Sequence, residues 1–434
     1  MARHFRKKHN KKFVKVPPVS TVKIQSLGVR GDGIGRTENG DLIFVPYTLA
    51  GETVIAKPTK VKGEGYSATV VELVESSPDR IEASCPHFTQ CGGCKLQHMP
   101  LSEQKKFKQN IVQGALDKQD FEVKVSETIV VGGLRRRARF VVKKSGKGYV
   151  GGFHKAGSHA IAEIKSCEIV SPAVWNTFQE VLKVLPRFNA PKALDVHITE
   201  GLNGVEVVLY PHGEYDLDLM GREILTDLVN TQKFNGLYCF SGDFVDPVCV
   251  LQTLQIKFGE VVVGIPPASF LQPSVQGQKT LTNLIMSTLK ERNVKGRIAD
   301  FFCGSGCFSF PLTEFGSVDA FEGNATALNL LNKTASGKGV NGFVRDLELN
   351  PVETDECDGY KAIVLDPPRS GALSQVEQIA DSICPVLIYI SCNPIALARD
   401  SVVLERGGYI LKTVIPVDQF SHSDHTESLA IFEK

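Results

Sequence analysis

The last third of the chain alternates between short apolar runs and helix-like segments, and this alternation constrains the fold more than any other feature. The apolar runs are residues 296–302, 317–323, 342–348, 360–366, 386–391 and 410–417. Strand–helix alternation is typical of a doubly wound α/β sheet, in which ligands bind at the carboxyl ends of the strands. We therefore predict such a sheet, with a Rossmann-like fold, over residues 259–434.

The length of the chain predicts a multidomain protein, because 434 residues are more than one hydrophobic core ordinarily holds. Short glycine-broken strands indicate a small β-barrel over residues 17–78, after a basic tail at 1–16 that we expect to be disordered. Strands with a helix near 172–185 predict a central α+β domain over 79–258. A further helix at 101–118 is expected to pack on the last domain.

Basic residues concentrate in two segments that contain no acid. Residues 1–15 hold seven Lys and Arg, residues 128–162 hold eight, and the remainder of the chain has an excess of acids. This asymmetry predicts a polyanionic partner such as nucleic acid, although a solvated tail and hairpin would look similar. The candidate RNA contacts are Arg135, Arg136, Arg137, Arg139, His154 and Lys155.

Targeting features are absent from the sequence pattern. No apolar run approaches the roughly 18–20 residues of a membrane span, and the basic N-terminus lacks the apolar core of a signal peptide. We therefore expect a cytoplasmic protein without a membrane partner, and a monomer.

A glycine-rich turn follows the first strand of the predicted sheet. The sequence Asp300-Phe-Phe302-Cys-Gly304-Ser-Gly306 would let backbone N–H groups approach a ligand closely. The next two strands end at Glu322 and Asp346, where a ribose diol and an adenine amino group would need acceptors. The same acids would also be found at these positions if they only capped helices.

Three chemically active side chains are expected at one edge of this sheet. Asp366 and Cys392 end neighbouring strands, and Glu427 begins the last one. Cys392 alone could equally be a small buried apolar residue. Together the three suit methylation of a pyrimidine at carbon 5: a thiolate adds to carbon 6, and a base later removes the carbon 5 proton. A helix starting after Cys392 would help to lower its thiol pKa.

The motifs DFFCGSG, DPPRSG, YISCNP and HTES resemble those of the RNA (uracil-5-)-methyltransferases, most closely the iron–sulfur branch that acts on 23S ribosomal RNA. The resemblance implies that Cys392 is the nucleophile and Glu427 the base, and that Asp366 lies in the uracil pocket. It also implies S-adenosylmethionine contacts from Gln272, Glu322, Asp366 and the backbone around Phe302. The chain departs from the family's F-P-H at Phe420-Ser421-His422.

Four further cysteines form a second pattern. Cys85, Cys91 and Cys94 have C-x5-C-x2-C spacing, and Cys167 follows later. Spacing alone allows either zinc or an iron–sulfur cluster. The family resemblance implies a [4Fe–4S] cluster on these four residues, with a structural or RNA-recognition role. The barrel resembles a TRAM domain by its position and strand pattern.

Three alternatives remain open at this point. The D-P-P-R motif also resembles loops that bind exocyclic amines in amino-group methyltransferases, although that activity would leave Cys392 and Glu427 without roles. A catalytically inactive RNA-binding module would bind RNA without transferring a methyl group. The same carbon 5 chemistry could instead act on the T-loop uridine of transfer RNA.

Overall fold

The computed structural model describes residues 16–241 and 244–434, which form two compact units. One unit contains the chain up to Ser84 together with Lys95–Pro100, and the other contains Cys85–Cys94 and Leu101–Lys434. The predicted basic tail lies outside the described residues except for Val16. The predicted domain boundaries at 78 and 258 stay predictions.

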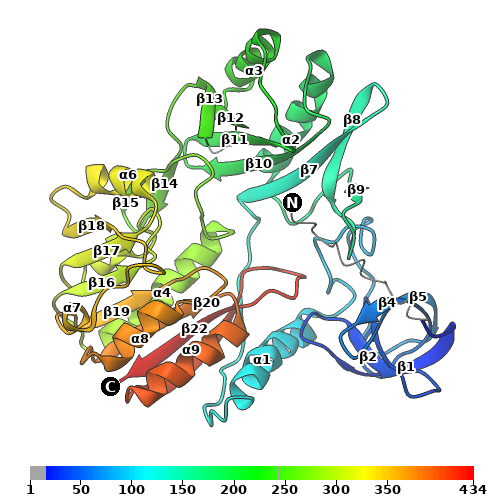
Figure 1. Cartoon of the computed structure of the whole chain (residues 1–434), viewed down its shortest axis with the longest axis horizontal. Coiled ribbons are helices and arrows are strands. Elements are labelled where there is room, and N and C mark those ends of the chain that lie inside the picture. Colours follow the sequence, from blue (N-terminus) through cyan, green and yellow to red (C-terminus); the bar gives the residue numbers. More distant parts are fainter. Residues whose placement is uncertain (1–15, 242–243) are drawn as a thin grey trace, which may run out of the picture. The chain divides into compact units, whose positions relative to one another are not determined.

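The first unit contains a closed five-stranded barrel, as the sequence predicts (Figure 1). Its strand order is β1-β2-β3-β5-β4, with bounds Ser20–Leu27, Gly33–Arg36, Leu42–Val45, Thr53–Lys62 and Gly65–Glu75 for β1 to β5. Alternate side chains point inward, as the two-residue repeat of a strand requires. The small core consists of Val22, Ile24, Ile43, Val45, Val54, Ala56 and Ala68.

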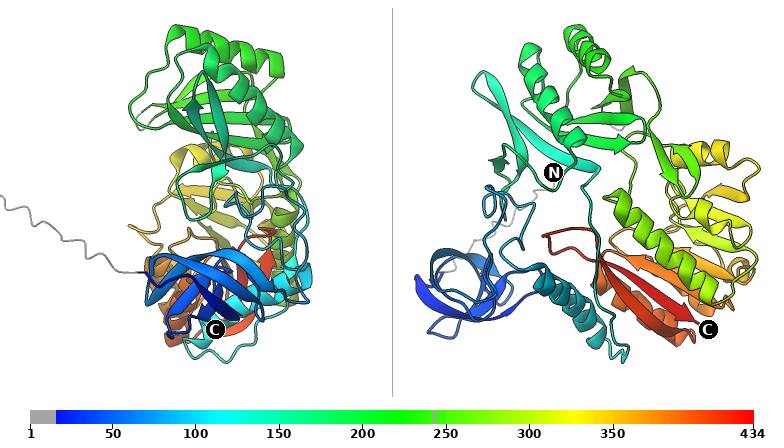
Figure 2. Two further views of the ribbon diagram at one scale, coloured as in Figure 1. Left: turned by 90° about the vertical axis from the view of Figure 1, so that its right-hand side faces the viewer. Right: turned by 180° about the vertical axis from the view of Figure 1, so that it is seen from behind.

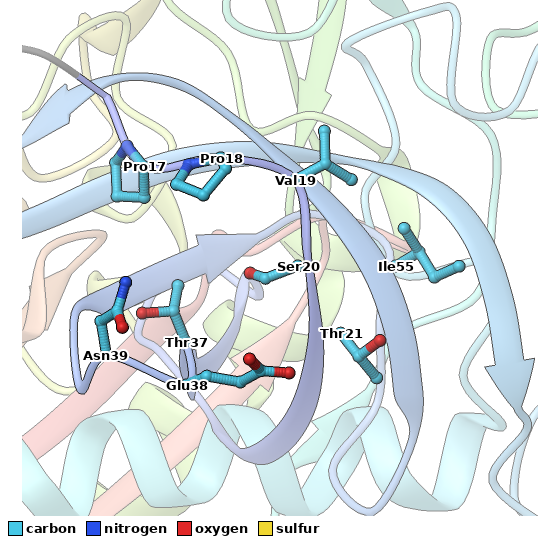
Figure 3. Close-up of a pocket in the computed structure, with 9 residues that line it drawn as sticks. All are labelled: Pro17, Pro18, Val19, Ser20, Thr21, Thr37, Glu38, Asn39 and Ile55. Atoms are coloured by element: carbon cyan, nitrogen blue, oxygen red, sulfur yellow. The ribbon is translucent and has the colours of Figure 1, made fainter.

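A pocket of about 280 Å³ lies on the barrel (Figure 3). Its lining comes from the chain before and within β1, from the turn after β2 and from β4. The lining residues are Pro17, Pro18, Val19, Ser20, Thr21, Thr37, Glu38, Asn39 and Ile55. Glu38 is its one charged side chain, and none of these residues is a candidate for the chemistry predicted above.

The second unit contains a seven-stranded sheet of order β13-β12-β11-β10-β7-β8-β9. In chain order, β7 to β13 span Arg137–Ser145, Gly148–His154, Ile161–Glu163, Ala193–Gly201, Gly204–Pro211, Gly236–Ser241 and Phe244–Val250. Helix α2 (Pro172–Val184), which continues into the short helix η1 (Leu185–Arg187), confirms the helix predicted near 172–185. Helix α3 (Leu219–Gln232) was not predicted; it connects β11 to β12, a parallel pair that requires a crossover.

The same unit contains an eight-stranded sheet of order β18-β17-β16-β19-β20-β22-β21-β6. Five strands, β16 to β20, pair in parallel. They span Ile298–Phe301, Val318–Glu322, Val340–Val344, Ala362–Leu365 and Val386–Ser391. The strand order reverses between β16 and β19, which is where doubly wound sheets bind their ligands.

The last strand, β22 (Glu427–Glu433), runs antiparallel between β20 and β21 (Ile410–Asp418). Its first residue therefore lies at the carboxyl edge of the parallel strands. A two-residue strand, β6 (Ile129–Val130), adds to the outer side of β21. A separate hairpin, β14 (Gln255–Phe258) and β15 (Val261–Gly264), precedes the sheet.

Helices cover both faces of this sheet, which confirms the doubly wound prediction (Figures 1 and 2). One core takes side chains from α4 (Val275–Glu291), α5 (Ser309–Leu312) and α6 (Ala325–Ala335). The other takes side chains from α1 (Leu101–Asp117), α7 (Thr354–Cys357), α8 (Leu373–Asp381) and α9 (Pro394–Arg406). In the part of the chain that is described, no helix has the length and apolar character needed to cross a membrane.

Candidate active site

The carboxyl edge of the sheet brings Asp366, Cys392 and Glu427 together. Asp366 directly follows β19 and Cys392 directly follows β20, and these two strands pair in parallel. Glu427 begins β22, which pairs antiparallel with β20 through Ser391 and Ser428. The negative charges of both carboxyls raise the pKa of the Cys392 thiol.

Two glutamine side chains link the two carboxyls. The Gln272 Nε2 donates to Asp366 Oδ2 at 3.1 Å, and the Gln419 Nε2 donates to Gln272 Oε1 at 2.7 Å. The same Gln419 nitrogen donates to Glu427 Oε2 at 3.1 Å. This chain of hydrogen bonds fixes which end of the Gln272 amide faces Asp366, because its oxygen is already used by Gln419.

Burial strongly affects both carboxyls. It raises the pKa of the Glu427 carboxyl to about 7, with the Gln419 hydrogen bond acting in the opposite direction. Burial, followed by the nearby Glu427 and Asp300, raises the pKa of Asp366 well above its ordinary value. A carboxyl with a pKa near neutrality can both accept and release a proton at physiological pH, as a general base must.

Cys392 lies between β20 and α9, where Asn393 caps the helix by accepting from the Ile395 N–H at 3.2 Å. Burial, then Glu427 and Asp366, raise the pKa of the Cys392 thiol to about 11, while Arg369 lowers it. The sequence expectation of a lowered thiol pKa is therefore wrong for the protein alone. Burial and two neighbouring carboxyls outweigh the helix and the single cation.

The D-P-P-R-S-G loop is held by α9 and by Asn393, which caps that helix. The Asn393 side chain donates to the Arg369 carbonyl at 3.0 Å, and Arg399 donates to the Ser370 carbonyl at 2.9 Å. Asp400, which is fully buried, accepts from the Ala372 N–H at 3.0 Å. The loop after Asp366 is thus tied to the helix that starts after Cys392, which couples the positions of the two residues.

The glycine-rich turn after β16 contains three residues in left-handed backbone conformation. Phe302, Gly304 and Gly306 have φ values of 60°, 57° and 93°. A Cβ added to Gly304 would meet no atom within 4 Å, whereas one added to Gly306 would lie 2.8 Å from the Phe310 ring. Gly304 therefore leaves open space for a ligand, and Gly306 allows close packing, as in nucleotide-binding turns.

Of the two strand-end acids predicted to meet the cofactor, Glu322 contacts this turn and Asp346 lies near Gly323, which follows Glu322. Glu322 accepts from the Gly304 N–H at 3.0 Å and from the Asn324 N–H at 2.9 Å. Asp346 is exposed and lies near Gly323, but its carboxylate also accepts from the Glu348 N–H at 3.0 Å. Both residues keep acceptor capacity for a ligand, because a carboxylate can accept several hydrogen bonds.

Asp300 lies inside the sheet, beneath the glycine-rich turn. It is fully buried, and one of its carboxylate oxygens accepts from the Ser309 hydroxyl. Its other oxygen has no hydrogen-bond partner within the described part of the chain. Burial raises the pKa of Asp300 to about 7. A direct contact between Asp300 and the cofactor stays a prediction.

The four arginines of the basic segment have different surroundings. Arg135 is half-buried, and its guanidinium lies 5.5 Å from the centre of the Phe420 ring. Arg136 is buried and donates to the Gln272 carbonyl at 3.0 Å and to Gln278 at 2.9 Å. Arg136 is thus bonded within the protein beside the candidate site, and a contact between Arg136 and RNA stays a prediction.

Arg137 is half-buried like Arg135, whereas Arg139, His154 and Lys155 are exposed. The Arg137 guanidinium lies 4.3 Å from the centre of the Phe270 ring, which is 64% exposed. Arg139 is exposed and forms an ion pair with Asp195. His154 and Lys155 are exposed at the end of β8. There the backbone of Lys155 forms an isolated antiparallel β-bridge with Cys91.

The four predicted metal-binding cysteines lie in one unit and are partly buried. The Gly92 N–H donates to the His154 carbonyl at 2.8 Å, and the Lys165 N–H donates to His87 at 3.0 Å. These bonds tie the segment that carries Cys85, Cys91 and Cys94 to the region of Cys167. Burial raises the pKa of the Cys91 thiol, and the charges of Cys167 and Cys85 raise it further.

No metal site is apparent at these cysteines: within residues 16–241 and 244–434, no three His, Cys, Asp or Glu side chains are arranged to hold a metal ion. The donor set nevertheless suits iron–sulfur chemistry, because thiolates are the usual ligands of such clusters. A multi-iron cluster separates its ligand sulfurs more widely than one ion does. The predicted cluster is therefore compatible with these residues but is not shown by them.

Sequence reasoning missed three residues at this site: Lys108, Phe270 and Gln419. Lys108 and Asp418 form a fully buried ion pair beside the candidate base. Lys108 occupies the same helix face as Val112 and Leu116, four and eight residues later, so its place in an apolar stripe was a detectable signal. Phe270 and Gln419 carry no comparable signal, because loop positions lack periodicity.

Comparisons with known proteins agree with this geometry. The tRNA (Uracil-5-)-methyltransferase family matches residues 238–434, and the TRAM domain matches residues 17–70. An RNA methyltransferase of Brucella melitensis is 35% identical, over 95% of this chain and 97% of that protein. The 23S rRNA (uracil(1939)-C(5))-methyltransferase of Pectobacterium carotovorum is 29% identical, over 95% and 93%.

A solved structure shares the fold over the whole chain. The Pyrococcus abyssi tRNA (uracil-54, C5)-methyltransferase, in complex with S-adenosyl-L-homocysteine, superposes with a TM-score of 0.72 at 23% identity, covering 96% of this chain and 98% of that one. With the sequence matches, this identifies the barrel as a TRAM domain and the doubly wound sheet as a methyltransferase fold. The chain therefore belongs to the family of S-adenosylmethionine-dependent RNA (uracil-5-)-methyltransferases.

Proposed function

We propose that this enzyme methylates carbon 5 of a specific uridine in 23S ribosomal RNA, with Cys392 as nucleophile and Glu427 as base. The observation that carries the assignment of roles is the hydrogen-bonded chain from Asp366 through Gln272 and Gln419 to Glu427, at the edge where Cys392 ends β20. Ribosomal RNA is favoured by the relatives of 28–29% identity that are named for 23S rRNA.

In the proposed reaction, Cys392 acts as the nucleophile and Glu427 as the base. The Cys392 thiolate forms a bond to carbon 6 of uracil, and the electron pair of the broken C5=C6 π bond passes to carbon 5 and its conjugated carbonyl. When bound, S-adenosylmethionine supplies an electrophilic methyl group on a sulfonium cation. Glu427 then removes the proton from carbon 5, which re-forms the double bond and releases the cysteine as thiolate.

Asp366 and Gln272 are proposed to orient the reactants. Burial and the nearby Glu427 and Asp300 raise the pKa of Asp366, which favours its protonated form; that form would donate a hydrogen bond to a uracil carbonyl, where negative charge develops after thiolate addition. Gln272, Glu322, Asp346 and the turn containing Phe302, Gly304 and Gly306 would hold the methyl donor. The open space at Gly304 supports this placement.

We further propose that Cys85, Cys91, Cys94 and Cys167 hold a [4Fe–4S] cluster with a structural role. Four cysteines would occupy all four irons and leave none for a substrate. The hydrogen bonds of Gly92 and Lys165 support a shared location for the four ligands. The cluster would thereby order the start of the basic segment, because the Arg135 N–H donates to the Ile169 carbonyl at 2.8 Å, two residues after Cys167.

RNA contacts are proposed for the half-buried and exposed members of the basic segment: Arg135, Arg137, Arg139, His154 and Lys155. Reaching the base requires flipping the nucleotide, which costs a few kcal/mol, and phosphate contacts can offset that cost. The exposed Phe270 ring beside Arg137 offers an apolar surface for a nucleobase.

The substrate is tested by incubating the purified enzyme and labelled S-adenosylmethionine with unmodified 23S rRNA and, separately, with unmodified transfer RNA. We expect labelled 5-methyluridine in 23S rRNA only, located by nuclease mapping. Labelled 5-methyluridine in transfer RNA alone would support the alternative, the T-loop uridine, which the fold match to a transfer RNA enzyme keeps in view. Label on an exocyclic amine, or in neither RNA, would contradict the proposal.

A further inference from the structure

Helix α1 reaches into the candidate site through one lysine. Lys108 is fully buried, and its ammonium forms an ion pair with Asp418, the last residue of β21, which is also fully buried. The same ammonium donates to the Phe420 carbonyl at 3.1 Å, and the Phe420 N–H donates to Asp418 at 3.1 Å. Three contacts thus fix the backbone on both sides of Gln419.

Gln419 is the residue that this anchor holds in place. Its amide bridges Gln272 and Glu427, at 2.7 and 3.1 Å. It also packs against α4, where a Cβ added to Gly277 would lie 2.2 Å from Gln419 Oε1. The bridge therefore has little freedom to adopt another position while the loop stays anchored.

A buried lysine is unfavourable for folding, so its presence calls for a specific role of its charge. Burying an ion pair costs desolvation that its attraction barely offsets, and apolar residues of similar volume are often equally stable at such positions. Here the side chain occupies an apolar stripe of α1 with Val112 and Leu116. Stability alone gives little reason for a lysine at this position.

We propose that Lys108 is a positioning residue for the methylation reaction: through Asp418 and the Phe420 carbonyl it fixes the loop that presents Gln419 to Glu427 and Gln272. This inference rests on the proposed function, because it assumes that Glu427 removes the carbon 5 proton. Lys108 does not touch the substrate. Its effect is on the placement of the base, and hence on the step after methyl transfer.

The predicted consequence is specific. If the base is displaced, addition of Cys392 and transfer of the methyl group can still occur, but release of the cysteine is delayed. Ordinary uridine-containing RNA would then remain covalently bound to the enzyme and carry the new methyl group. A residue that only stabilises the fold would lower the amount of active protein without making this adduct accumulate.

The test compares Lys108→Met, the double variant Lys108→Met with Asp418→Leu, and Gln419→Leu. The double variant removes both charges, because a single unpaired buried charge is strongly destabilising. Lys106→Met is the matched control, since Lys106 is on the same helix with a side chain that is 68% exposed. Each folded protein is incubated with unmodified RNA and labelled S-adenosylmethionine, and covalent adduct is measured on a denaturing gel alongside turnover.

We expect kcat to fall by about 100-fold in the folded Lys108 variants and in Gln419→Leu, with labelled adduct accumulating, because a small misplacement can cost this much. Lys106→Met should match the unmodified enzyme. Normal turnover in Gln419→Leu or in the folded double variant would overturn the proposal, as would slow turnover without adduct. If Glu427→Gln itself accumulates no adduct, the proposed function fails instead, whatever the Lys108 variants do.

Discussion

The active-site edge and the four-cysteine region differ in how their functional groups are held. At the edge, Asp366, Gln272, Gln419 and Glu427 are joined by direct side-chain hydrogen bonds. The cysteine region is positioned mainly by backbone bonds, such as Gly92 to the His154 carbonyl. The first region is organised by the polypeptide alone, whereas the second gathers four cysteines whose final geometry would be set by the cluster that we propose they bind.

Because of this difference, substitutions at the active-site edge should reduce turnover more than substitutions elsewhere. Glu427→Gln keeps the shape of the side chain and can still bond to Gln419, but it cannot accept the carbon 5 proton. We expect turnover to fall roughly 10²–10⁴-fold, the usual contribution of a general base. Single-turnover methyl transfer should be much less affected than steady-state release. Equal loss in both measurements would contradict the role of Glu427 as the base.

A substitution in the four-cysteine region should reduce the amount of bound iron rather than the rate of the methylation reaction. Cys167→Ser removes one proposed ligand while leaving Cys85, Cys91 and Cys94. We expect iron retained through anaerobic purification to fall by at least about tenfold, by analogy with changes around metal sites. Cys249→Ser, on β13, is the matched control. Full iron content and unchanged visible absorbance in Cys167→Ser would refute this assignment.

The pH dependence of turnover should reflect the ionisable groups at the carboxyl edge of the sheet and not the four cysteines proposed as iron ligands. Both Cys392, with a thiol pKa of about 11, and Glu427, with a pKa of about 7, must lose a proton to act. Because Glu427 acts after the methyl group has been transferred, its ionisation should appear in kcat, which should increase about tenfold per pH unit up to about pH 7 where release of the product limits turnover. The inflection near 7 should disappear in Glu427→Gln. An unchanged profile in that variant would show that another group titrates.

The same carboxyl should also affect stability in a defined direction. Its folded-state pKa, about 7, lies above the ordinary value of 4.5, so the folded protein keeps a proton that the unfolded chain releases between these values. The contribution of Glu427 to the free energy of unfolding should thus fall as pH rises from about 4.5 to about 7. Thermal unfolding of Glu427→Gln should show a weaker dependence over this range. A stronger dependence would contradict the burial of this carboxyl.

The smallest effect is expected at the exposed part of the basic segment. Arg139→Ala should weaken RNA binding only a few-fold, and the slope of log affinity against log salt should decrease by about one, because one phosphate contact is lost. Arg187→Ala, at the end of η1, is a comparison outside the basic segment. A slope that is the same with and without Arg139 would remove it from the RNA contacts.

The sequence predicted the doubly wound sheet well because its buried strands are continuous apolar runs ended by polar motifs. The carboxyl-edge residues could be predicted for the same reason, since parallel strands place their ends together. Helix α3 was missed because Gly221 and Thr226 interrupt a weak helical pattern. The raised thiol pKa of Cys392 could not be predicted, because it depends on burial and on two carboxyls distant in sequence.

Contacts between distant segments explain the remaining gaps. Lys108 and Asp418 are 310 positions apart, so only the fold brings them together. In the sequence, the four arginines of residues 135–139 predict a single basic patch. In the structure Arg136 is buried and bonded inside the protein, whereas Arg139 is exposed, because neighbouring positions on an extended chain face opposite ways or meet different partners.

The central claim is that Cys392 forms a covalent bond with the target uracil. The most direct measurement is peptide mapping by mass spectrometry after incubating the enzyme, S-adenosylmethionine and RNA that contains 5-fluorouridine, whose fluorine cannot be removed as a proton. We predict one RNA-bound peptide, modified at Cys392, and no adduct in Cys392→Ala. An adduct that persists in Cys392→Ala, or that maps to another cysteine, would contradict the account.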